Sequence, residues 1–264
     1  MAVVNVTPDS FYAASRTPQR ELIVERVRSA IEEGAAIIDI GGYSSRPGAG
    51  DVPLQEELRR VLTGIECVRE LSKSIPISVD TFRAEVAAKA VEVDDRIIIN
   101  DISAGELDSD MVKVAAESGV PYIAMSMRGT PATMASMCRY SDVVSEVADY
   151  MRRRSEYLME QGVSRENILL DPGFGFAKSV DQNYELLGGL DKLFALGFPL
   201  AAGISRKSMI YKTLGTGPEE SLFGTTALHW ELLRCGVTLL RVHDTRAAVD
   251  TIRIFNKFKS LNDK

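Results

Sequence analysis

Short runs of apolar, mostly branched residues recur along the chain at intervals of roughly 30 residues. Runs of this length, without strict alternation of polar and apolar positions, are typical of strands buried on both faces of a parallel sheet. Eight such runs predict eight strands, at residues 2–6, 36–40, 76–80, 97–101, 121–125, 168–171, 199–203 and 238–242.

Segments with helical periodicity separate the predicted strands. In residues 19–33 apolar side chains share one face, and Gly34 follows as a helix end signal. The same reasoning predicts helices at residues 54–72, 82–92, 108–118, 142–161, 222–233 and 245–258. This alternation predicts an α/β fold, a (β/α)8 TIM barrel, with residues 1–264 as one domain. A doubly wound open sheet is the alternative, disfavoured because no glycine-rich phosphate loop follows the first strand.

The sixth predicted strand ends on a carboxylate, Asp171, and the loop sequence DPGFGF begins with that residue. Proline and glycine break the strand, so Asp171 lies at its carboxyl end, where α/β barrels carry their active sites. The loop glycines let the backbone approach a ligand closely, and the two phenylalanines offer flat faces. A turn without function is the alternative for this stretch taken alone.

Other strands also end on residues with useful chemistry. Barrel closure would bring these residues to one mouth: Asn5, Arg46, Asp80, Asn100, Met125, Asp171, Ser205 to Lys207, Arg241 and His243. Taken singly, Asp80 and Asn100 could be helix N-caps, Arg241 an ion-paired surface group and His243 an ordinary loop histidine. Polar residues at nearly every successive strand end are hard to attribute to caps. Asp101 is interpreted as a cap and left out of the site.

The strand-end residues divide into two chemical groups. Amide and carboxylate edges suit a flat heterocycle with N–H donors and ring acceptors, on which Met125 and Phe176 could pack. This group is Asp80, Asn100 and Asp171. A cationic and polar group suits phosphate oxygens and consists of Asn5, Arg46, Arg241 and His243. The run SRKS at residues 205–208 opens a helix, and helix N-termini attract anions.

Composition restricts the partners. The formal net charge of −6 argues against nucleic acid or an anionic membrane as the main partner, and no apolar run is long enough to span a membrane. Three widely spaced cysteines are interpreted as reduced, buried residues of a cytoplasmic protein. Neither His229 nor His243 lies at zinc-ligand spacing from a cysteine.

Seven motifs together resemble dihydropteroate synthase, an enzyme family of folate synthesis. They cover nearly the whole chain: NVTPDSF at residues 5–11, GGYSSRPG at 41–48, SVDT at 78–81, IND at 99–101, DPGFGF at 171–176, SRKS at 205–208 and RVHD at 241–244. The resemblance implies a transferase that condenses hydroxymethyl-dihydropterin pyrophosphate with para-aminobenzoate, with Mg²⁺ as cofactor. It also implies a homodimer, whose apolar surface the 222–233 helix or the last helix could supply. A methyltetrahydrofolate-type methyltransferase and a non-catalytic pterin-binding protein are the alternatives.

The resemblance also implies residue roles. The catalytic residues would be Asp80, Lys207, Arg241 and His243. The pterin would be held by Asp80, Asn100, Met125, Asp171, Phe176 and Lys207. The pyrophosphate would be held by Asn5, Ser45, Arg46, Arg241 and His243, with Mg²⁺ near Asn5. The para-aminobenzoate would be held by Arg46, Pro47, Phe176 and Ser208.

Three positions depart from the family pattern. Only four residues precede Asn5, where the family usually has an N-terminal hairpin, so we expect either a less stable protein or a fragment. Ser126 stands where the family often has histidine, and Phe223 stands where asparagine is usual.

Overall fold

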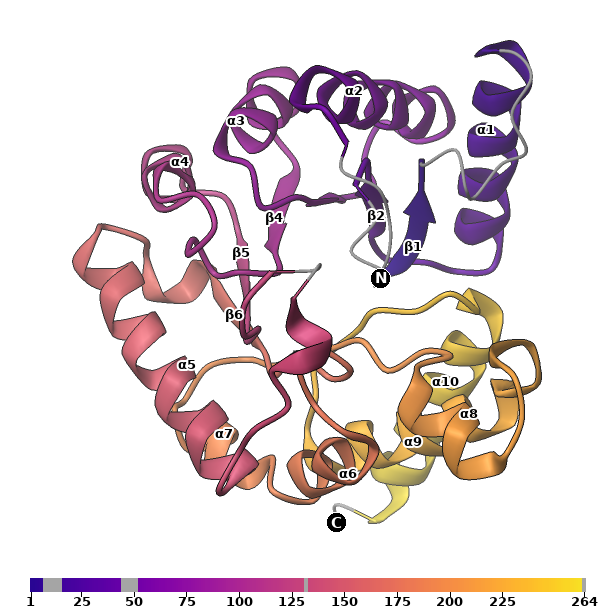
Figure 1. Cartoon of the computed structure of the whole chain (residues 1–264). Helices are drawn as coiled ribbons and strands as arrows, with labels where there is room; N and C mark the ends of the chain where they lie inside the picture. The colour runs from indigo at the N-terminus through magenta and orange to yellow at the C-terminus, as the bar shows by residue number, and fades with distance from the viewer. Residues whose placement is uncertain (7–15, 44–51, 131–132, 263–264) are drawn as a thin grey trace.

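The computed structural model describes residues 1–6, 16–43, 52–130 and 133–262, and within these ranges parallel strands form a ring that helices surround (Figure 1). The strands are β1 (Ala2–Asn5), β2 (Ile38–Gly41), β3 (Ile77–Asp80), β4 (Ile97–Asp101), β5 (Tyr122–Met125), β6 (Ile168–Asp171), β7 (Ala201–Ala202) and β8 (Leu239–Leu240). All eight predicted strands are present. β7 and β8 have two residues each where five were predicted, and the other strands differ from the predicted length by at most one residue.

The ring closes at two junctions between the sheets, here called seams. Strands β1 to β6 pair in sequence order, and β7 pairs with β8. A parallel bridge from Leu170 to Leu200 joins β6 to the chain before β7, and a bridge from Ala2 to Val242 joins β1 to the chain after β8. The amide of Val3 donates to the carbonyl of Val242 at 2.9 Å across the second seam. The predicted (β/α)8 barrel is therefore confirmed, and the open sheet is excluded.

The helices follow the strands as the periodicity predicts. Those with predicted counterparts are α1 (Arg16–Glu32), α2 (Leu54–Leu71), α3 (Ala84–Val93), α4 (Asp110–Ser118), α5 (Val143–Glu160), α9 (Leu222–Cys235) and α10 (Thr245–Asn262). The sequence pattern gives no bounds for α6 (Val180–Gly188) and α7 (Asp191–Phe194), and SRKS opens α8 (Ser208–Leu214). Short 3-10 helices are η2 (Met134–Ser136), η3 (Arg165–Asn167) and η4 (Pro218–Glu220).

Burial of the strands on both faces explains their composition. Ile38, Ile40, Ile77 and Val79 are all fully buried, and helix side chains such as Val61 of α2 cover them. A second, smaller apolar cluster consists of Ile102, Met125, Met127, Met134, Phe176 and Ala177. Cys67 is buried as predicted, but Cys138 and Cys235 are only half-buried, so the prediction was wrong for those two. No helix in the described ranges is long and apolar enough to cross a lipid bilayer.

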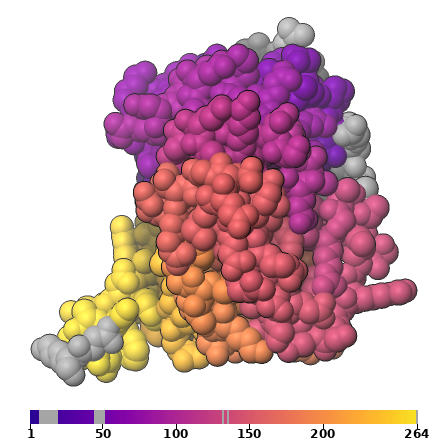
Figure 2. Space-filling model, turned by 90° about the vertical axis from the view of Figure 1, so that its left-hand side faces the viewer, coloured from indigo at the N-terminus to yellow at the C-terminus, as the bar shows by residue number. Residues whose placement is uncertain are grey.

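Helix α10 leaves the body of the molecule at its end. Figure 2 shows this yellow segment projecting from the body of the molecule. Its apolar side chains Ile254, Phe258 and Leu261 are exposed by 54–64%. Trp230 of α9 contacts Phe255 and Phe258 edge to face, at ring-centroid distances of 5.3 and 5.7 Å. Trp230 is therefore a packing residue.

Gly173 fixes the turn that follows β6. Its φ is +69°, and a Cβ atom there would lie 2.0 Å from the carbonyl oxygen of Ser126. The close approach is thus to the chain's own backbone after β5, whereas the sequence predicted an approach to a ligand. Any side chain at this position would push two neighbouring strand ends apart.

We predict that Gly173→Ala lowers the free energy of unfolding by at least about 3 kcal/mol, because left-handed strain and a backbone clash add together. Gly119 is a matched control, since its φ is +64° and a Cβ atom added there would have no neighbouring atom within 4 Å. Gly119→Ala should cost only about 1 kcal/mol, the strain alone. Urea denaturation of both variants is the measurement, and equal losses would contradict the clash.

Candidate active site

One row of strand partners crosses the mouth of the barrel. The register pairs Asn5 with Gly41, Gly41 with Asp80, and Asp80 with Asn100. Gly41 has no side chain, and a Cβ atom there would lie 3.3 Å from Asn5 Oδ1 and 3.8 Å from Asp80 Oδ2. The side chains of Asn5 and Asp80 therefore lean toward each other over the glycine. The predicted site residues Asn5, Asp80 and Asn100 therefore lie at one level of the barrel.

Arg241 binds two carboxylates of neighbouring strands. Its Nε donates to Asp39 Oδ2 at 2.6 Å, and its Nη2 donates to Asp80 Oδ2. Asp39 is fully buried and Asp80 nearly so. Burial raises the pKa of the Asp80 carboxyl above its usual range, against the opposing effect of Arg241 and with a further rise from Asp39. Arg241 is thus ion-paired inside the mouth, so the alternative of a surface ion pair was wrong.

Asp39 is a residue that the sequence reasoning missed. Its second carboxylate oxygen, Oδ1, accepts from the side-chain nitrogen Nδ2 of Asn100 at 3.4 Å. Asp39 therefore fixes the amide orientation of Asn100 while it holds the guanidinium of Arg241. A carboxylate inside the apolar run of residues 36–40 was the available signal, because a buried charge needs a partner.

Asp171 and Lys207 form the opposite side of the mouth. Asp171 Oδ1 accepts from the amide of Gly173 at 2.7 Å, and burial raises the pKa of this carboxyl against the attraction of Lys207. The ammonium of Lys207 donates to the carbonyl of Phe174 and lies 4.7 Å from the ring centroid of Phe176. Burial lowers the pKa of Lys207 to about 8, although Asp171 and Asp80 raise it. The ammonium of Lys207 therefore interacts with carboxylates on both sides of the mouth, Asp171 and Asp80.

The two phenylalanines of the DPGFGF loop face different ways. Phe176 joins Met125 in the second apolar cluster, where the ring of Phe176 and the side chain of Met125 are nearly buried. Phe174 is fully buried in the main core, so the prediction of two flat faces was wrong for Phe174. The glycines on either side of it in the chain, Gly173 and Gly175, both have left-handed φ values, +69° and +81°.

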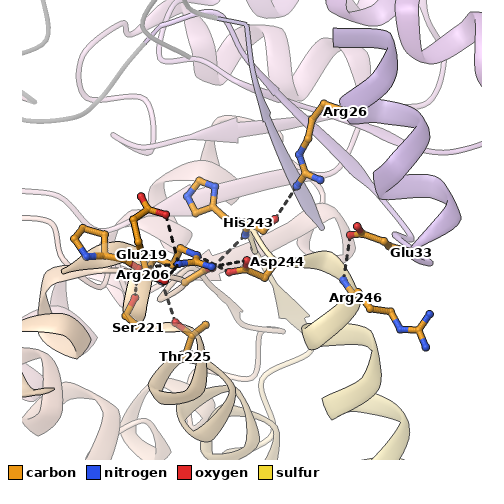
Figure 3. Close-up of polar contacts among 11 residues, drawn as sticks. Arg26, Glu33, Arg206, Glu219, Ser221, Thr225, His243, Asp244 and Arg246 are labelled. Atoms are coloured by element: carbon orange, nitrogen blue, oxygen red, sulfur yellow. Dashed lines mark hydrogen bonds and ion pairs between the residues drawn. The ribbon is translucent and has the colours of Figure 1, made fainter. Parts of the chain in front are cut away.

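His243 is held through its backbone. Its amide donates to Ser205 Oγ at 3.2 Å, and its carbonyl accepts from Arg26 Nη2 of α1 at 2.7 Å (Figure 3). Val242 is buried between the half-buried Arg241 and His243. Ser208 is the first residue of α8 and is half-buried. The predicted site residues Ser45, Arg46 and Pro47 lie outside the described residues.

The alternative interpretation of Asp80 and Asn100 as helix N-caps was wrong. Asp101 does act as a cap, but of a turn. The side chains of Asp80 and Asn100 contact Arg241 and Asp39. At the start of α3, the amide of Ala84 donates instead to Asp108 Oδ2 at 2.8 Å. Asp101 is fully buried and closes the turn after β4, accepting from the amides of residues 103 and 105 and from the Tyr122 hydroxyl.

Lys178 is a second residue that the sequence reasoning missed. Its ammonium donates to the carbonyls of Gly173 and Phe176, at 3.0 and 3.1 Å, so it closes the DPGFGF loop from within. The side chain is buried, and burial lowers its pKa from 10.5 to about 7, although the nearby Asp171 raises it. A lysine two residues beyond Phe176 gives no sequence signal of burial.

We predict that Lys178→Met flattens the pH dependence of stability. Between about pH 7 and 10.5 the unfolded chain holds a proton that the folded state has lost, so the free energy of unfolding rises with pH. The slope from one such group is at most about 1.4 kcal/mol per pH unit. Urea unfolding at pH 7, 8 and 9 measures it. Lys192→Met, at a half-exposed lysine, should keep the wild-type slope, and an unchanged slope in Lys178→Met would contradict a lowered pKa.

Comparison with known proteins gives a consistent result. Residues 1–243 match the family described as pterin binding enzyme. The dihydropteroate synthase of Synechocystis is 39% identical over 255 residues, which is 96% of this chain and 88% of that protein. The solved dihydropteroate synthase of Xanthomonas albilineans with 4-aminobenzoic acid has a TM-score of 0.90 at 39% identity, over 98% of this chain and 92% of that one. A second structure from that organism, in complex with 7,8-dihydropteroate, has a TM-score of 0.88 at 36% identity, over the same shares. The chain therefore belongs to the pterin binding enzymes and, within them, to the dihydropteroate synthase family.

Proposed function

We propose that this protein is a dihydropteroate synthase, which joins hydroxymethyl-dihydropterin pyrophosphate to para-aminobenzoate and releases pyrophosphate. The observation that carries the proposal is the convergence of Asp80, Asn100 and Asp171 with the cations Lys207 and Arg241 at one barrel mouth. Carboxylates and an amide suit the hydrogen-bonding edge of a pterin, and the cations suit an anionic leaving group.

The pterin is proposed to bind between the two sides of the mouth. Asp171 accepts from ring N–H groups on one side, and Asp80 and Asn100 meet the ring from the other. Met125 and Phe176 pack against its face, supported by their place in the second apolar cluster. Lys207 lies over the ring of Phe176 and next to Asp171, so it borders both the pterin and the incoming amine.

The pyrophosphate is proposed to bind where β1 and β8 meet. Asn5, Arg241 and His243 are the described residues of this side, and Ser45 and Arg46 stay predictions from the sequence. Among the described residues, no group of three or more acidic, histidine or cysteine side chains forms a cage for a metal ion. Mg²⁺ usually takes few protein ligands and completes its shell with substrate phosphates and water. The amide oxygen of Asn5, beside Asp80, fits such a site.

Cation neutralisation is the proposed source of rate enhancement. The bond between the pterin methylene carbon and the pyrophosphate oxygen breaks, and the electron pair leaves with pyrophosphate. Arg241 and His243 stabilise the charge that develops on this oxygen, and Mg²⁺ when bound supplies further Lewis-acid stabilisation. The electron-rich pterin stabilises the carbon, the aminobenzoate nitrogen then forms a bond to it, and that nitrogen loses a proton to solvent. Ser208 at the start of α8, with Arg46, Pro47 and Phe176, is proposed to hold the aminobenzoate.

The test of the function is an assay for dihydropteroate with both substrates, with and without Mg²⁺. Product that depends on both substrates supports the synthase. A methyltransferase or a non-catalytic pterin-binding protein would form none.

We predict that Asp171→Asn weakens pterin binding by about 2 kcal/mol or more, because one of two acceptor oxygens becomes a donor in a buried site. Asp101→Asn is the matched control, since Asp101 is equally buried but serves the turn after β4. Calorimetry of each folded variant with a pterin that lacks pyrophosphate is the measurement. Equal affinity in Asp171→Asn and wild type would remove Asp171 from the pterin site.

A homodimer is proposed from an apolar surface on α8, α9 and α10, here called the α9–α10 face. It comprises Leu214, Phe223, Ile254, Phe258 and Leu261, each more than half exposed, and Phe223 is 84% exposed. These helices pack together, since α9 contacts both α8 and α10. Apolar side chains gathered on adjacent helices are typical of an interface between subunits.

We predict that Phe223→Asp weakens self-association at least tenfold, because it places a charge on the α9–α10 face. The matched control is Val93→Asp, at a 57% exposed residue of α3 on another part of the surface. Sedimentation velocity over a range of concentrations measures the change. A wild-type protein that stays monomeric, or a Phe223→Asp variant that stays dimeric, would contradict this interface.

A further inference from the structure

The guanidinium of Arg206 is bound by protein groups on several sides. Its Nε and Nη2 donate to the two carboxylate oxygens of Asp244, at 2.8 and 2.9 Å. Its Nη1 donates to the carbonyls of Pro218 and Glu219, at 2.8 and 2.7 Å (Figure 3). Four of the five N–H groups of a guanidinium are therefore used. Arg206 has little capacity left for a substrate anion, although it stands in the SRKS motif.

The backbone of Arg206 is also constrained. Its φ is +54°, a left-handed value that side-chain-bearing residues seldom adopt. Its amide donates to Thr225 Oγ1 of α9 at 3.1 Å. The bidentate contact with Asp244 is half-buried, with 22% and 24% of the two side chains exposed. A strained residue that is held by its own side chain on one side and by α9 on the other has a fixed position.

The residues beside this ion pair are those predicted to act on the substrates. Lys207 follows Arg206 in the chain, and His243 precedes Asp244. Ser205, on the other side of Arg206, accepts from the amide of His243. The loop after β7 and the loop after β8 are therefore joined at two points next to Lys207 and His243, one between Ser205 and His243 and one between Arg206 and Asp244.

We propose that Arg206 and Asp244 form a clamp whose role is to position Lys207 relative to His243, so that Arg206 is a positioning residue of the reaction. The proposal rests on the function proposed above, in which Lys207 borders the pterin and His243 holds the pyrophosphate. The scissile bond lies between these two groups of the substrate. Holding the two side chains at a fixed separation is thus a requirement of the chemistry, because small misplacements of positioned groups can cost large factors in rate.

Two other roles for Arg206 make different predictions. If Arg206 bound pyrophosphate directly, its effect would be independent of His243, and the two losses would multiply. If it only stabilised the fold, substitution would lower the free energy of unfolding but leave the kinetic constants of the folded protein unchanged. A clamp predicts a loss that depends on the presence of His243.

The experiment is a double-mutant cycle on the full chain, with Arg206→Met, His243→Ala and the combination. We expect Arg206→Met to lower kcat/KM for the pyrophosphate ester by about 30-fold in the wild-type background. In the His243→Ala background we expect Arg206→Met to lower kcat/KM by less than about fivefold. Arg206→Lys, which keeps the charge but loses the bidentate fork, should give an intermediate loss. Asp244→Asn combined with Arg206→Met should be no worse than Arg206→Met alone, within about threefold.

Arg246→Met is the matched control. Arg246 lies two residues beyond Asp244, its exposed side chain pairs with Asp250 of its own helix, and its backbone amide would still donate to Glu33. We expect its kcat/KM to stay within about twofold of wild type. Near-ultraviolet circular dichroism of each variant checks that the folded state is retained, and Asp244→Asn serves as the second test of the clamp if Arg206→Met does not fold.

Titration with inorganic pyrophosphate and Mg²⁺ repeats the cycle without catalysis. Arg206→Met should weaken binding in the wild-type background but not in His243→Ala. Equal losses in both backgrounds, or no loss in a folded variant, would overturn the clamp. A wild type that forms no dihydropteroate but shows the coupled loss in pyrophosphate binding would instead contradict the proposed function and leave the clamp standing.

Discussion

The contact between Arg241 and the carboxylates of Asp39 and Asp80 is the interaction on which the barrel mouth depends. Two acidic side chains on adjacent parallel strands, shielded from water, would repel each other without a cation between them. The cation comes from the end of β8, next to the seam that closes the ring. Removal of one partner from a buried pair of this kind typically costs about 3–5 kcal/mol, because the remaining charge has no compensation.

This arrangement changes how Arg241 must be interpreted. The sequence placed it with His243 in a phosphate-binding group, separate from the carboxylates. In the structure it is bound to Asp80, which is proposed to meet the pterin, and through Asp39 it is linked to Asn100. Loss of Arg241 would therefore disturb both substrate subsites. His243, which precedes the acidic partner of the clamp, is the better residue for testing the pyrophosphate side alone.

The strand-end rule explains how much could be predicted from the sequence. Polar residues that end an apolar run, such as Asp80 and Asn100, must lie at the mouth if the runs are parallel strands, and the register places them there. The rule says nothing of a polar residue inside a run, so Asp39 was missed. Lys178 was missed because its partners are carbonyls of a loop that exists only in the folded chain. Arg206 was noted for a helix-opening motif with affinity for anions, but its anion is a carboxylate of the same chain, which spacing alone could not reveal.

The short lengths of β7 and β8 explain why side-chain contacts lie around the clamp and the last seam. Strands β7 and β8 share two register pairs, whereas β1 and β2 share four, so backbone hydrogen bonds hold this part of the ring less firmly. Side chains supply the missing contacts there. Arg206 and Asp244 join the loops after β7 and β8. Across the last seam, Arg26 of α1 binds the carbonyl of His243, and Glu33, directly after α1, binds the amide of Arg246 (Figure 3). Side-chain contacts therefore supplement the short sheet in this part of the ring, so substitution at the Arg206–Asp244 ion pair is expected to act on the reaction as well as on stability.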